Sequence, residues 1–476
     1  MKLYIITILA LLVSLTSCED LLVEAPKSLA VQTFYNTADE VDGAVAAIYS
    51  PLRNGNGFGA VYVAMLETST DYHMGRASWA PPSEFQGLDG TNITRVGTVW
   101  NNFYLSIRNA NLVIKNAPNG KGISEADKNK FIGEAKFLRA LTYFHLVRNW
   151  GGVIIRTQDN MEEESLTRSS TDAVYDLIKQ DLLFAEDNLP DAVSAAGRAT
   201  KWAAKSLLAD VYFYLGDHAQ ASSKANEVIS SSKYSLVEVA KPDDFLKLFG
   251  ADVVSSPEEI FYFKFSQEQS WAYPLYTNGV GTPYLLQAGY MALYSTLEQP
   301  VYASWDDKDL RKSYNWYKWS FGLGDNTILN KKFSDAANLQ PRTDYPLYRY
   351  ADVLLLYAEA SCEAEGRPTT LGLEALNKVR RRAYGYNTAQ VSPVDYKLAN
   401  YSKESFIELV RKERGYETQA EGKRWLDLKR TGKANDYIKA ATKKSISEKH
   451  YLWPLPVSEL NYNSALNPTA DQNPGY

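Results

Sequence analysis

The stretch Glu134-Ala-Lys-Phe-Leu-Arg-Ala-Leu-Thr-Tyr-Phe-His-Leu-Val-Arg148, followed by Trp150-Gly-Gly152, decides the fold class. Phe137, Leu141 and Phe144 recur at spacings of four and three residues, which places them on one face of a helix. The two glycines after Trp150 end the periodic pattern. The stretch therefore predicts a long helix with one face packed into a core.

Helical patterns dominate most of the remaining chain. Ser124 is a suitable N-cap for the helix predicted at 124–149. Spacing and capping signals predict further helices at 39–52, 96–115, 171–188, 201–215, 218–231, 350–365, 371–383 and 403–421. The pair 201–215 and 218–231 has small residues at the helix crossing and Gly216 in the turn, as in a tetratricopeptide unit, and 350–383 has a similar shape. The sequence therefore predicts a mainly α fold built from helix pairs.

Residues 236–345 break the helical pattern. The run Ile260-Phe-Tyr-Phe-Lys-Phe265 predicts a strand. From Trp271 to Trp319 there are four Trp and eight Tyr, or 12 rings in 49 residues, against 13% aromatic residues overall. These rings follow neither helical nor strand spacing, so this region is predicted to be irregular. Residues 67–95 are also predicted to be an irregular loop, because they are rich in Gly, Pro and Ser.

The N-terminus carries an export signal. Lys2 precedes the apolar run 4–15, which is too short to span a bilayer and ends in Leu15-Thr-Ser-Cys18. This ending resembles the bacterial lipobox, in which the cysteine becomes the acylated first residue of the mature protein. The resemblance predicts a signal peptide at 1–17, lipidation of Cys18 and a tether over 18–37. The acidic residues that follow Cys18 resemble a signal for export to the cell surface.

Composition excludes several classes of protein. The chain has 476 residues and a net charge of −5, so it has no basic footprint for nucleic acid. Cys362 is the only cysteine after Cys18, which rules out an internal disulfide framework. Tyrosine is abundant, with 33 Tyr against 17 Phe, and its ring with a polar end suits a surface that meets polar ligands.

Motifs along the whole chain together resemble the SusD/RagB family of outer-membrane glycan-binding lipoproteins. Besides the 134–152 stretch, they are Arg198-Ala-Thr-Lys-Trp-Ala-Ala-Lys205, Arg349-Tyr-Ala-Asp-Val-Leu-Leu-Leu-Tyr-Ala-Glu-Ala360, Ala375-Leu-Asn-Lys-Val-Arg-Arg-Arg382, Glu413-Arg414, Glu421-Gly-Lys-Arg-Trp-Leu-Asp-Leu-Lys-Arg430, Leu452-Trp-Pro-Leu-Pro456 and Gln472-Asn-Pro-Gly-Tyr476. No single motif is decisive, but their order and their spread from Cys18 to Tyr476 are specific. Gly415-Tyr-Glu-Thr-Gln419 departs from the regular Arg/Glu/Leu helix face usual in the family.

The resemblance implies a fold, a partner and a location. It implies a mainly α, SusD-like scaffold of four tetratricopeptide-like helix pairs that carries an irregular, aromatic-rich ligand-binding portion. We divide the mature chain accordingly into an N-terminal scaffold at 38–235, a ligand-binding portion at 236–348 and C-terminal helical pairs with an extended tail at 349–476. The implied protein is a lipid-anchored, cell-surface protein of the outer membrane that captures oligosaccharide or polysaccharide for a SusC-like TonB-dependent transporter. It is not an enzyme and needs no cofactor.

Aromatic residues outside the family motifs are the candidate ligand-binding residues. The flat C–H faces of sugar rings stack on aromatic side chains, and charged residues bond the hydroxyl groups. The candidates are Asp71, Tyr72, Arg76 and Trp79 in the early loop, and Trp271, Tyr290, Trp316 and Trp319 in the ring-dense region. The tryptophans inside family motifs are expected to pack in the core: Trp100, Trp150, Trp202, Trp425 and Trp453.

No catalytic or metal site is predicted. Asp306, Asp307 and Asp309 with Arg311 indicate a structural ion-pair cluster, with a calcium site as the minor alternative, because the ligand spacing and central glycine of an EF-type loop are missing. Other charged or imidazole groups are expected to be structural or solvated: Glu162-Glu-Glu164 on a loop, His145 and His218 on helices, and Arg380-Arg-Arg382 in ion pairs on a helix surface.

Three other functions stay open at this point. A RagB-like protein of the same fold would bind peptides, and its groove would lack stacked rings. A glycoside hydrolase would need two opposed carboxylates, for which no residue pair argues. A scaffold that binds only proteins through its tetratricopeptide units would leave the rings of 271–319 without a role.

Overall fold

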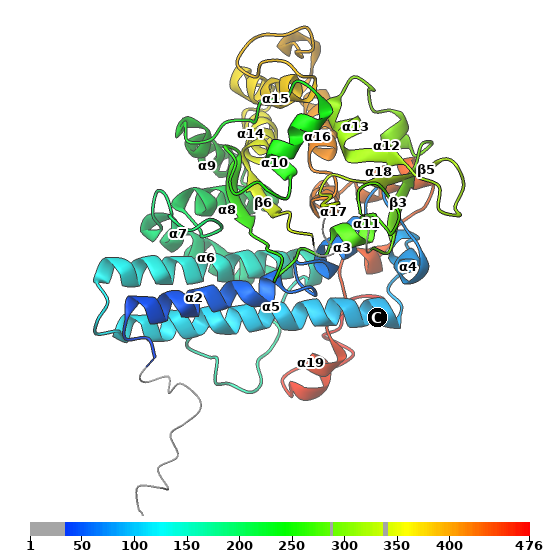
Figure 1. The fold of residues 1–476 in the computed structure, drawn as a ribbon. Coiled ribbons are helices and arrows are strands. Elements are labelled where there is room, and N and C mark those ends of the chain that lie inside the picture. The colour runs from blue at the N-terminus through cyan, green and yellow to red at the C-terminus, as the bar shows by residue number, and fades with distance from the viewer. Residues whose placement is uncertain (1–33, 286–288, 337–340) are drawn as a thin grey trace, which may run out of the picture.

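The computed structural model describes residues 34–285, 289–336 and 341–476 (Figure 1). About 52% of the chain is helical, which confirms the mainly α class. Three long helices lie side by side at the base of Figure 1, namely α2 (Ala38–Arg53), α5 (Gly90–Asn116) and α6 (Glu125–Trp150). Cys18 lies outside the described residues, so its lipidation stays a prediction. In the described part, no helix is both long and apolar enough to cross a membrane.

Helix α6 forms as its sequence predicts. The hydroxyl of Ser124 accepts a hydrogen bond from the amide of Asp127 at 3.1 Å, which caps the N-terminus. Gly151 has a φ of +76°, a left-handed conformation that suits glycine and ends the helix. Phe137, Leu141 and Phe144 are all fully buried, but every other residue from Phe137 to Trp150 is buried too, so this part of α6 is packed on all sides and the expectation of a single core face is wrong.

The remaining long helices stack one on the next above this base. They are α7 (Thr171–Asn188), α8 (Lys201–Tyr214), α9 (His218–Ser230), α14 (Tyr350–Glu365), α15 (Thr370–Ala383) and α16 (Lys403–Glu417). Helix α6 packs on α7, α7 on α8, α8 on α9 and α9 on α14, while α15 and α16 both pack on α14. Gly216 (φ +79°) turns the chain between α8 and α9, and Gly366 (φ +67°) ends α14. Both predicted helix pairs are confirmed.

Shorter helices and strands fill the space beside this stack. The helices are α3 (Val61–Thr68), α4 (Ala80–Ser83), α10 (Leu246–Phe249), α11 (Pro274–Thr277), α12 (Pro300–Ala303), α13 (Leu310–Asn315), α17 (Arg424–Arg430), α18 (Ala434–Thr442) and α19 (Val457–Tyr462). The 3-10 turns are η2 (Ala77–Trp79), η3 (Ala117–Asn119), η4 (Pro242–Phe245), η5 (Leu398–Asn400) and η6 (Glu448–His450). The strands are β1 (Met74–Gly75), β2 (Glu259–Phe263), β3 (Leu293–Thr296), β4 (Trp316–Lys318), β5 (Thr327–Asn330) and β6 (Tyr345–Arg349).

The ring-dense portion is more regular than its sequence indicates. The predicted strand near 260–265 is confirmed as β2, which pairs antiparallel with β6. The sequence did not predict the second sheet, whose strand order is β1-β3-β5-β4. Its first strand comes from the loop 67–95, which also contains η2 and α4 and is therefore not irregular throughout. The sheet joins this early loop to the ring-dense portion.

Two predictions for the C-terminal part need correction. The helix expected over 403–421 ends at Glu417, because Ala420 (φ +61°) and Gly422 (φ +67°) take left-handed conformations. The tail, expected to be extended, contains the short helix α19. The tail packs against the base, and the indole N–H of Trp150 donates to the carbonyl of Pro454 at 2.9 Å.

A buried charge network joins the ring-dense portion to the helical stack. Arg349 on β6 donates to Glu417 at 2.5 Å and to Glu421 at 2.6 Å. Lys332 donates to Glu421 at 2.6 Å, and Arg311 donates to Glu417 at 2.9 Å. Burial acts to raise the pKa of Glu417, but its arginine partners hold that pKa well below the usual range. The carboxylate is therefore ionised inside the protein.

Two arginines of the Arg380-Arg-Arg382 run do not lie on the helix surface, so that part of the prediction is wrong. Arg382 is fully buried and pairs with Glu258 and Glu417, and Arg381 is 1% exposed and pairs with Glu374 and Asp395. The partners of Arg382 lie 124 and 35 residues away in the chain, so the local sequence does not show its burial, whereas those of Arg381 lie only 7 and 14 residues away. The predicted ion pair of Asp309 with Arg311 is confirmed at 2.6 Å, with both side chains buried.

Of the five tryptophans predicted to pack in the core, four are buried and one is only partly buried. Trp100, Trp150, Trp425 and Trp453 are all at most 4% exposed, as expected. Trp202 is only partly buried, and its indole N–H donates to the Asp191 carboxylate at 3.2 Å. It lies at the start of α8, where one side of the helix faces solvent.

Candidate functional site

The four-stranded sheet has a buried face and a face lined with half-buried rings. In the ladder, Trp316 lies opposite Asn330, Tyr317 opposite Leu329 and Lys318 opposite Ile328. Side chains alternate between the faces of a strand, so Trp316 and Tyr317 point to opposite sides. Trp316 joins a small buried cluster with Tyr72, Trp305, Ile328 and Tyr416. Tyr317 therefore belongs to the opposite face.

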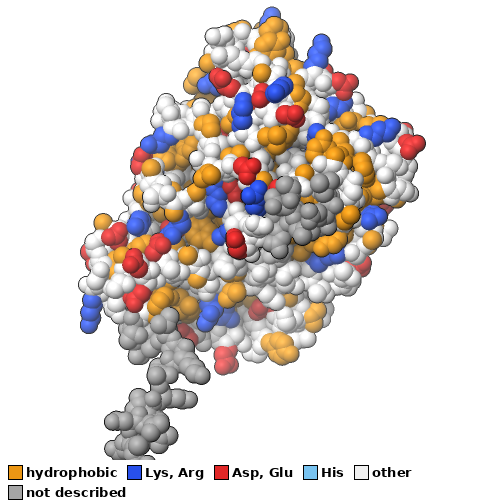
Figure 2. Space-filling model, in the orientation of Figure 1, with side chains coloured by type: hydrophobic (Ala, Val, Ile, Leu, Met, Phe, Trp, Pro, Cys, Tyr) orange, Lys and Arg blue, Asp and Glu red, His pale blue; other side chains and the backbone are white. Residues whose placement is uncertain are grey.

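The opposite face carries an array of aromatic side chains. The register puts Tyr294 of β3 on the same face as Tyr317, and Trp319, two residues beyond Tyr317, continues it. The Trp319 amide donates to the carbonyl of Thr327 at 3.1 Å, which extends the ladder to this residue. We call this surface the aromatic face, and it consists of Tyr276, Tyr284, Tyr290, Tyr294, Tyr317, Trp319 and Phe321. In Figure 2 hydrophobic side chains gather on the right of the molecule, where Figure 1 shows β3, β5 and α11.

Close ring contacts join the side chains of the aromatic face into three groups. Tyr284 lies 4.6 Å from Tyr317, and Tyr317 lies 6.3 Å from Trp319. Tyr294 meets Phe321 edge-on at 5.9 Å. Tyr290, at 59% exposure, is the most exposed of these rings, and it lies 5.5 Å from Tyr276. These rings are fixed by one another while parts of their surfaces stay open to solvent.

Arg76 places a cation within this array. Its guanidinium carbon lies 5.4 Å above the centroid of Phe321, and Nη2 donates to the carbonyl of Tyr290 at 2.9 Å. Arg76 is exposed, and it follows β1 directly, so the sheet itself sets its position. A guanidinium next to exposed rings can donate to hydroxyl groups of a ligand that stacks on them. The glycine at 289 (φ +124°) lets the chain pass close by, because a Cβ there would lie 2.5 Å from the carbonyl oxygen of Asn278.

Three of the eight predicted ligand-binding residues lie on this face: Arg76, Tyr290 and Trp319. The other five are buried. Trp271 is fully buried and its indole N–H donates to the carbonyl of Phe58 at 2.9 Å. Trp316 is 4% exposed and its indole N–H donates to Gln419 at 2.6 Å. Neither ring has a face free to stack on a sugar, so we assign both to packing.

The early-loop residues are also internal apart from Arg76. Trp79 is 6% exposed, and the guanidinium of Arg95 covers its ring at 3.7 Å. The hydroxyl of Tyr72 donates to Glu67 at 2.6 Å. Asp71 is 2% exposed and pairs with Arg424 at 2.5 Å. Their placement as ligand contacts is therefore corrected to a structural role, which is to hold the loop that presents Arg76.

The sequence analysis missed five members of the aromatic face: Tyr276, Tyr284, Tyr294, Tyr317 and Phe321. The density of rings in 271–319, which holds all of these except Phe321, was visible, but density does not separate inward from outward rings. The alternation in Trp316-Tyr-Lys-Trp319 was the available signal. It was hidden because rings occupy both faces of a strand only three residues long.

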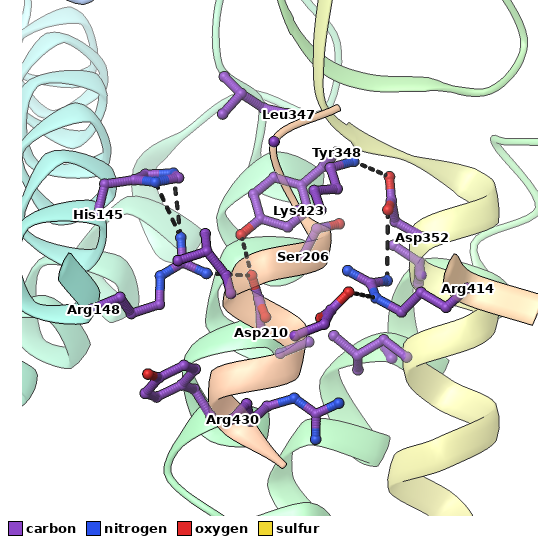
Figure 3. Close-up of a pocket in the computed structure, with 18 of the residues that line it drawn as sticks. His145, Arg148, Ser206, Asp210, Leu347, Tyr348, Asp352, Arg414, Lys423 and Arg430 are labelled. Atoms are coloured by element: carbon purple, nitrogen blue, oxygen red, sulfur yellow. Dashed lines mark hydrogen bonds and ion pairs between the residues drawn. The ribbon is translucent and has the colours of Figure 1, made fainter. Parts of the chain in front are cut away.

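A second candidate, an enclosed cavity, is too small and too occupied by ion pairs for an oligosaccharide (Figure 3). It measures about 40 Å³ and is lined by His145, Arg148, Asp210, Asp352 and Arg414, among others. Arg148 lies 3.8 Å from Asp210, and Arg414 lies 3.6 Å from Asp352. Such a volume holds about three water molecules. Burial and Arg148 lower the pKa of His145 well below its usual value, so this imidazole is neutral.

The described residues contain no group of three or more His, Cys, Asp or Glu side chains that could hold a metal ion. Asp306 instead accepts from the hydroxyl of Tyr384 at 3.0 Å, and Asp307 pairs with Lys312 at 2.7 Å. With Asp309 bound to Arg311, all three carboxylates of this run have protein partners.

Comparison with known proteins agrees with this architecture. A family model described as the SusD family matches residues 264–476. A second, described as "Starch-binding associating with outer membrane", matches residues 31–213. The chain belongs to the SusD family. It is 25% identical over 538 residues to SusD-like protein P25 of Formosa agariphila, with 99% of each chain covered.

Solved structures share the SusD fold. A SusD homolog from Bacteroides thetaiotaomicron superposes with a TM-score of 0.80 at 22% identity, covering 94% of this chain and 98% of that one. A laminarin-binding SusD-like protein superposes with a TM-score of 0.74 at 24% identity, covering 93% and 100%. At these identities the likeness establishes the arrangement of helices and strands.

Proposed function

We propose that this protein is a non-catalytic, surface-exposed lipoprotein that captures oligosaccharide or polysaccharide on its aromatic face. The observation that supports this proposal is an array of half-exposed rings on one side of the four-stranded sheet, with the guanidinium of Arg76 beside them. Sugar rings present flat C–H faces to such platforms and hydroxyl groups to the guanidinium. Trp319 and Tyr290 are the proposed stacking platforms, and Arg76 is the proposed hydrogen-bond donor.

Family membership supports the same ligand class. One matched family model is described as starch-binding, and one structural neighbour is described as laminarin-binding. Both descriptions concern glycans, which agrees with a surface built from rings. We extend the class of ligand to this chain, and leave the sugar and the linkage to experiment.

Weak binding suits this role. Stacking contributes about 1–3 kcal/mol per platform, by analogy with nucleic-acid bases on aromatic side chains. Two or three platforms with a few hydrogen bonds give roughly −4 to −6 kcal/mol, which corresponds to millimolar to tens of micromolar affinity. A protein that holds its ligand this loosely can release it to a transporter.

Delivery and anchoring complete the proposal. We propose lipidation at Cys18, residence in the outer membrane and transfer of the glycan to a SusC-like TonB-dependent transporter. The matched family model associates its members with the outer membrane, which supports the location. The test of surface display is protease accessibility on intact cells, and full protection would contradict it.

The binding test uses the soluble chain 19–476 in native gels that contain plant, fungal or host polysaccharides. Retardation by one class, lost in Trp319→Ala and kept in Trp202→Ala, would support capture on the aromatic face. Trp202 is the matched control, since it is a partly exposed tryptophan far along the chain from the sheet. Absence of retardation with every polysaccharide, together with binding of a peptide panel, would favour the RagB-like alternative.

A further inference from the structure

A groove that the proposed function does not use opens between α12, α16 and α18. Its volume is about 360 Å³, within the range of about 300–1,000 Å³ typical of small-molecule sites. Aliphatic side chains from two of the helices form its walls: Pro300, Val301, Ala440 and Ala441. Tyr416 of α16 closes the floor, and its ring is stacked on Trp305 at 4.4 Å with an interplanar angle of 5°.

The groove is built by the stretch that departs from the family pattern. Gly415 and Tyr416, the first two residues of Gly415-Tyr-Glu-Thr-Gln419, both line it. A Cβ at position 415 would lie 2.9 Å from Nη1 of Arg424, so glycine leaves room for this guanidinium beneath the floor. This stretch therefore helps to shape the groove.

Most of the charged groups that line the groove are paired. Asp71 and Arg424 form a two-bond ion pair at 2.5 and 2.9 Å. Glu408 accepts a hydrogen bond from the hydroxyl of Tyr437, and it lies 3.2 Å from Arg411 and 3.4 Å from Lys433. Partial burial acts to raise the pKa of Glu408, but these donors hold it below its usual value. Glu408 is therefore an ionised and already compensated carboxylate.

Lys412 is the exception among the charged side chains that line the groove. It is exposed, and its Nζ lies 5.8 Å from the Tyr416 ring. Within the described parts of the chain, no carboxylate lies within 4 Å of this ammonium group. The groove thus combines aliphatic walls with one uncompensated positive charge at its mouth. This combination favours a compact ligand that carries a single negative group.

We propose that this groove is a second ligand site, which takes a carboxylate-bearing sugar unit of an acidic polysaccharide. The carboxylate would pair with Lys412, the C–H face of the ring would lie on the aliphatic walls, and Ser304 and Glu408 would bond hydroxyl groups. The proposal rests on the glycan binding proposed above but uses different residues. The buried cluster of Tyr72, Trp316 and Tyr416 separates this groove from the aromatic face, so the two sites can be tested independently.

The test compares methyl glucuronide with methyl glucoside, which differ only in the carboxylate, by saturation-transfer NMR on the soluble chain 19–476. The glucuronide should bind and the glucoside should bind more weakly by about tenfold, because a charge-assisted hydrogen bond is lost. Lys412→Glu should remove this preference, and Ala440→Trp should abolish binding by filling the groove. Lys397→Glu is the matched control, an exposed lysine just before η5 that does not line the groove.

Several outcomes would overturn the proposal. Equal binding of the two glycosides, or a preference for glucuronide that survives Lys412→Glu, would rule out this site. N-acetyl-alanine binding as tightly as the glucuronide would reassign the groove to a peptide carboxylate. If polysaccharide retardation persists while neither glycoside binds, this inference fails and the proposed function stands. If Trp319→Ala alone abolishes glucuronide binding, the sugar is on the aromatic face instead.

Discussion

The helical stack and the ring-dense portion place their side chains by different means. In α6, the cap at Ser124 and the glycine at position 151 lie at the ends of the helix itself, so the signals that set its bounds are local. In the four-stranded sheet, neighbouring strands come from residues 74–75, 293–296, 316–318 and 327–330. Local signals therefore determine where the helices of the stack begin and end, whereas long-range register determines which rings the sheet exposes.

The two regions meet at the buried charge network. We expect acid to disrupt this network before it unfolds the helices of the stack. The pKa of Glu417 is depressed below its usual value of 4.5 in the folded state. A depressed carboxyl pKa contributes stability that is complete above pH 4.5 and is lost as pH falls toward the folded pKa. Burial opposes this shift, but Arg382, Arg349 and Arg311 outweigh it.

We therefore expect near-UV circular dichroism, which reports the packed rings, to be lost at a higher pH than the far-UV helical signal. Titration from pH 7 to pH 2 checks this, with refolding on return to pH 7 as the control for irreversible aggregation. Simultaneous loss of both signals would mean that the stack and the ring-dense portion unfold as one unit.

Glu417→Gln should weaken the same junction at neutral pH. The substitution keeps the shape of the side chain but leaves Arg349 and Arg382 without a full counter-charge in the interior. Breaking a buried ion pair from one side costs about 3–5 kcal/mol of the free energy of unfolding. Urea denaturation measures this loss. Glu163→Gln, on the exposed loop, is the control and should change stability by no more than about 0.5 kcal/mol.

Trp271→Ala and Trp319→Ala should separate packing from binding. Trp271 is fully buried against Phe333 and Tyr345, so its removal should cost about 3–5 kcal/mol of the free energy of unfolding. Trp319 is partly exposed, so its removal should leave stability nearly unchanged and weaken glycan binding by about 1–3 kcal/mol. Denaturation and affinity gels on both variants test whether Trp271→Ala loses mainly stability and Trp319→Ala loses mainly glycan affinity. Equal loss of affinity in a folded Trp271→Ala protein would place that ring in the site.

The same contrast explains what the sequence could and could not predict. Helices α7 and α14 have the predicted bounds because their caps and spacing are local signals. For Trp316 and Tyr317 the sequence offers adjacent rings, and only pairing with β5 shows that one faces inward and the other outward. Arg382 was misplaced for a similar reason, since Glu258 lies 124 residues away in the chain.

Residue type was informative where position was not. The density of rings in 271–319 indicated the portion that carries most of the aromatic face, and three of the eight predicted residues, Arg76, Tyr290 and Trp319, lie at this face. Asp71 and Arg76 lie five residues apart and were predicted to act together. The short strand β1 lies between them, and the structure directs Asp71 to Arg424 and Arg76 to Tyr290. Strand β1 forms only by pairing with β3, so it leaves no recognisable pattern in the local sequence.

Ser124→Ala should give the smallest effect and test how local the stack is. Its hydroxyl caps α6 by accepting from Asp127, and loss of a serine N-cap costs about 1 kcal/mol. The urea midpoint should fall slightly, and polysaccharide retardation should not change, because the cap acts only within the first turn. Ser194→Ala, at an exposed serine outside the helices, is the control. A change in retardation would mean that the base of the stack and the aromatic face are coupled more strongly than their separate packing implies.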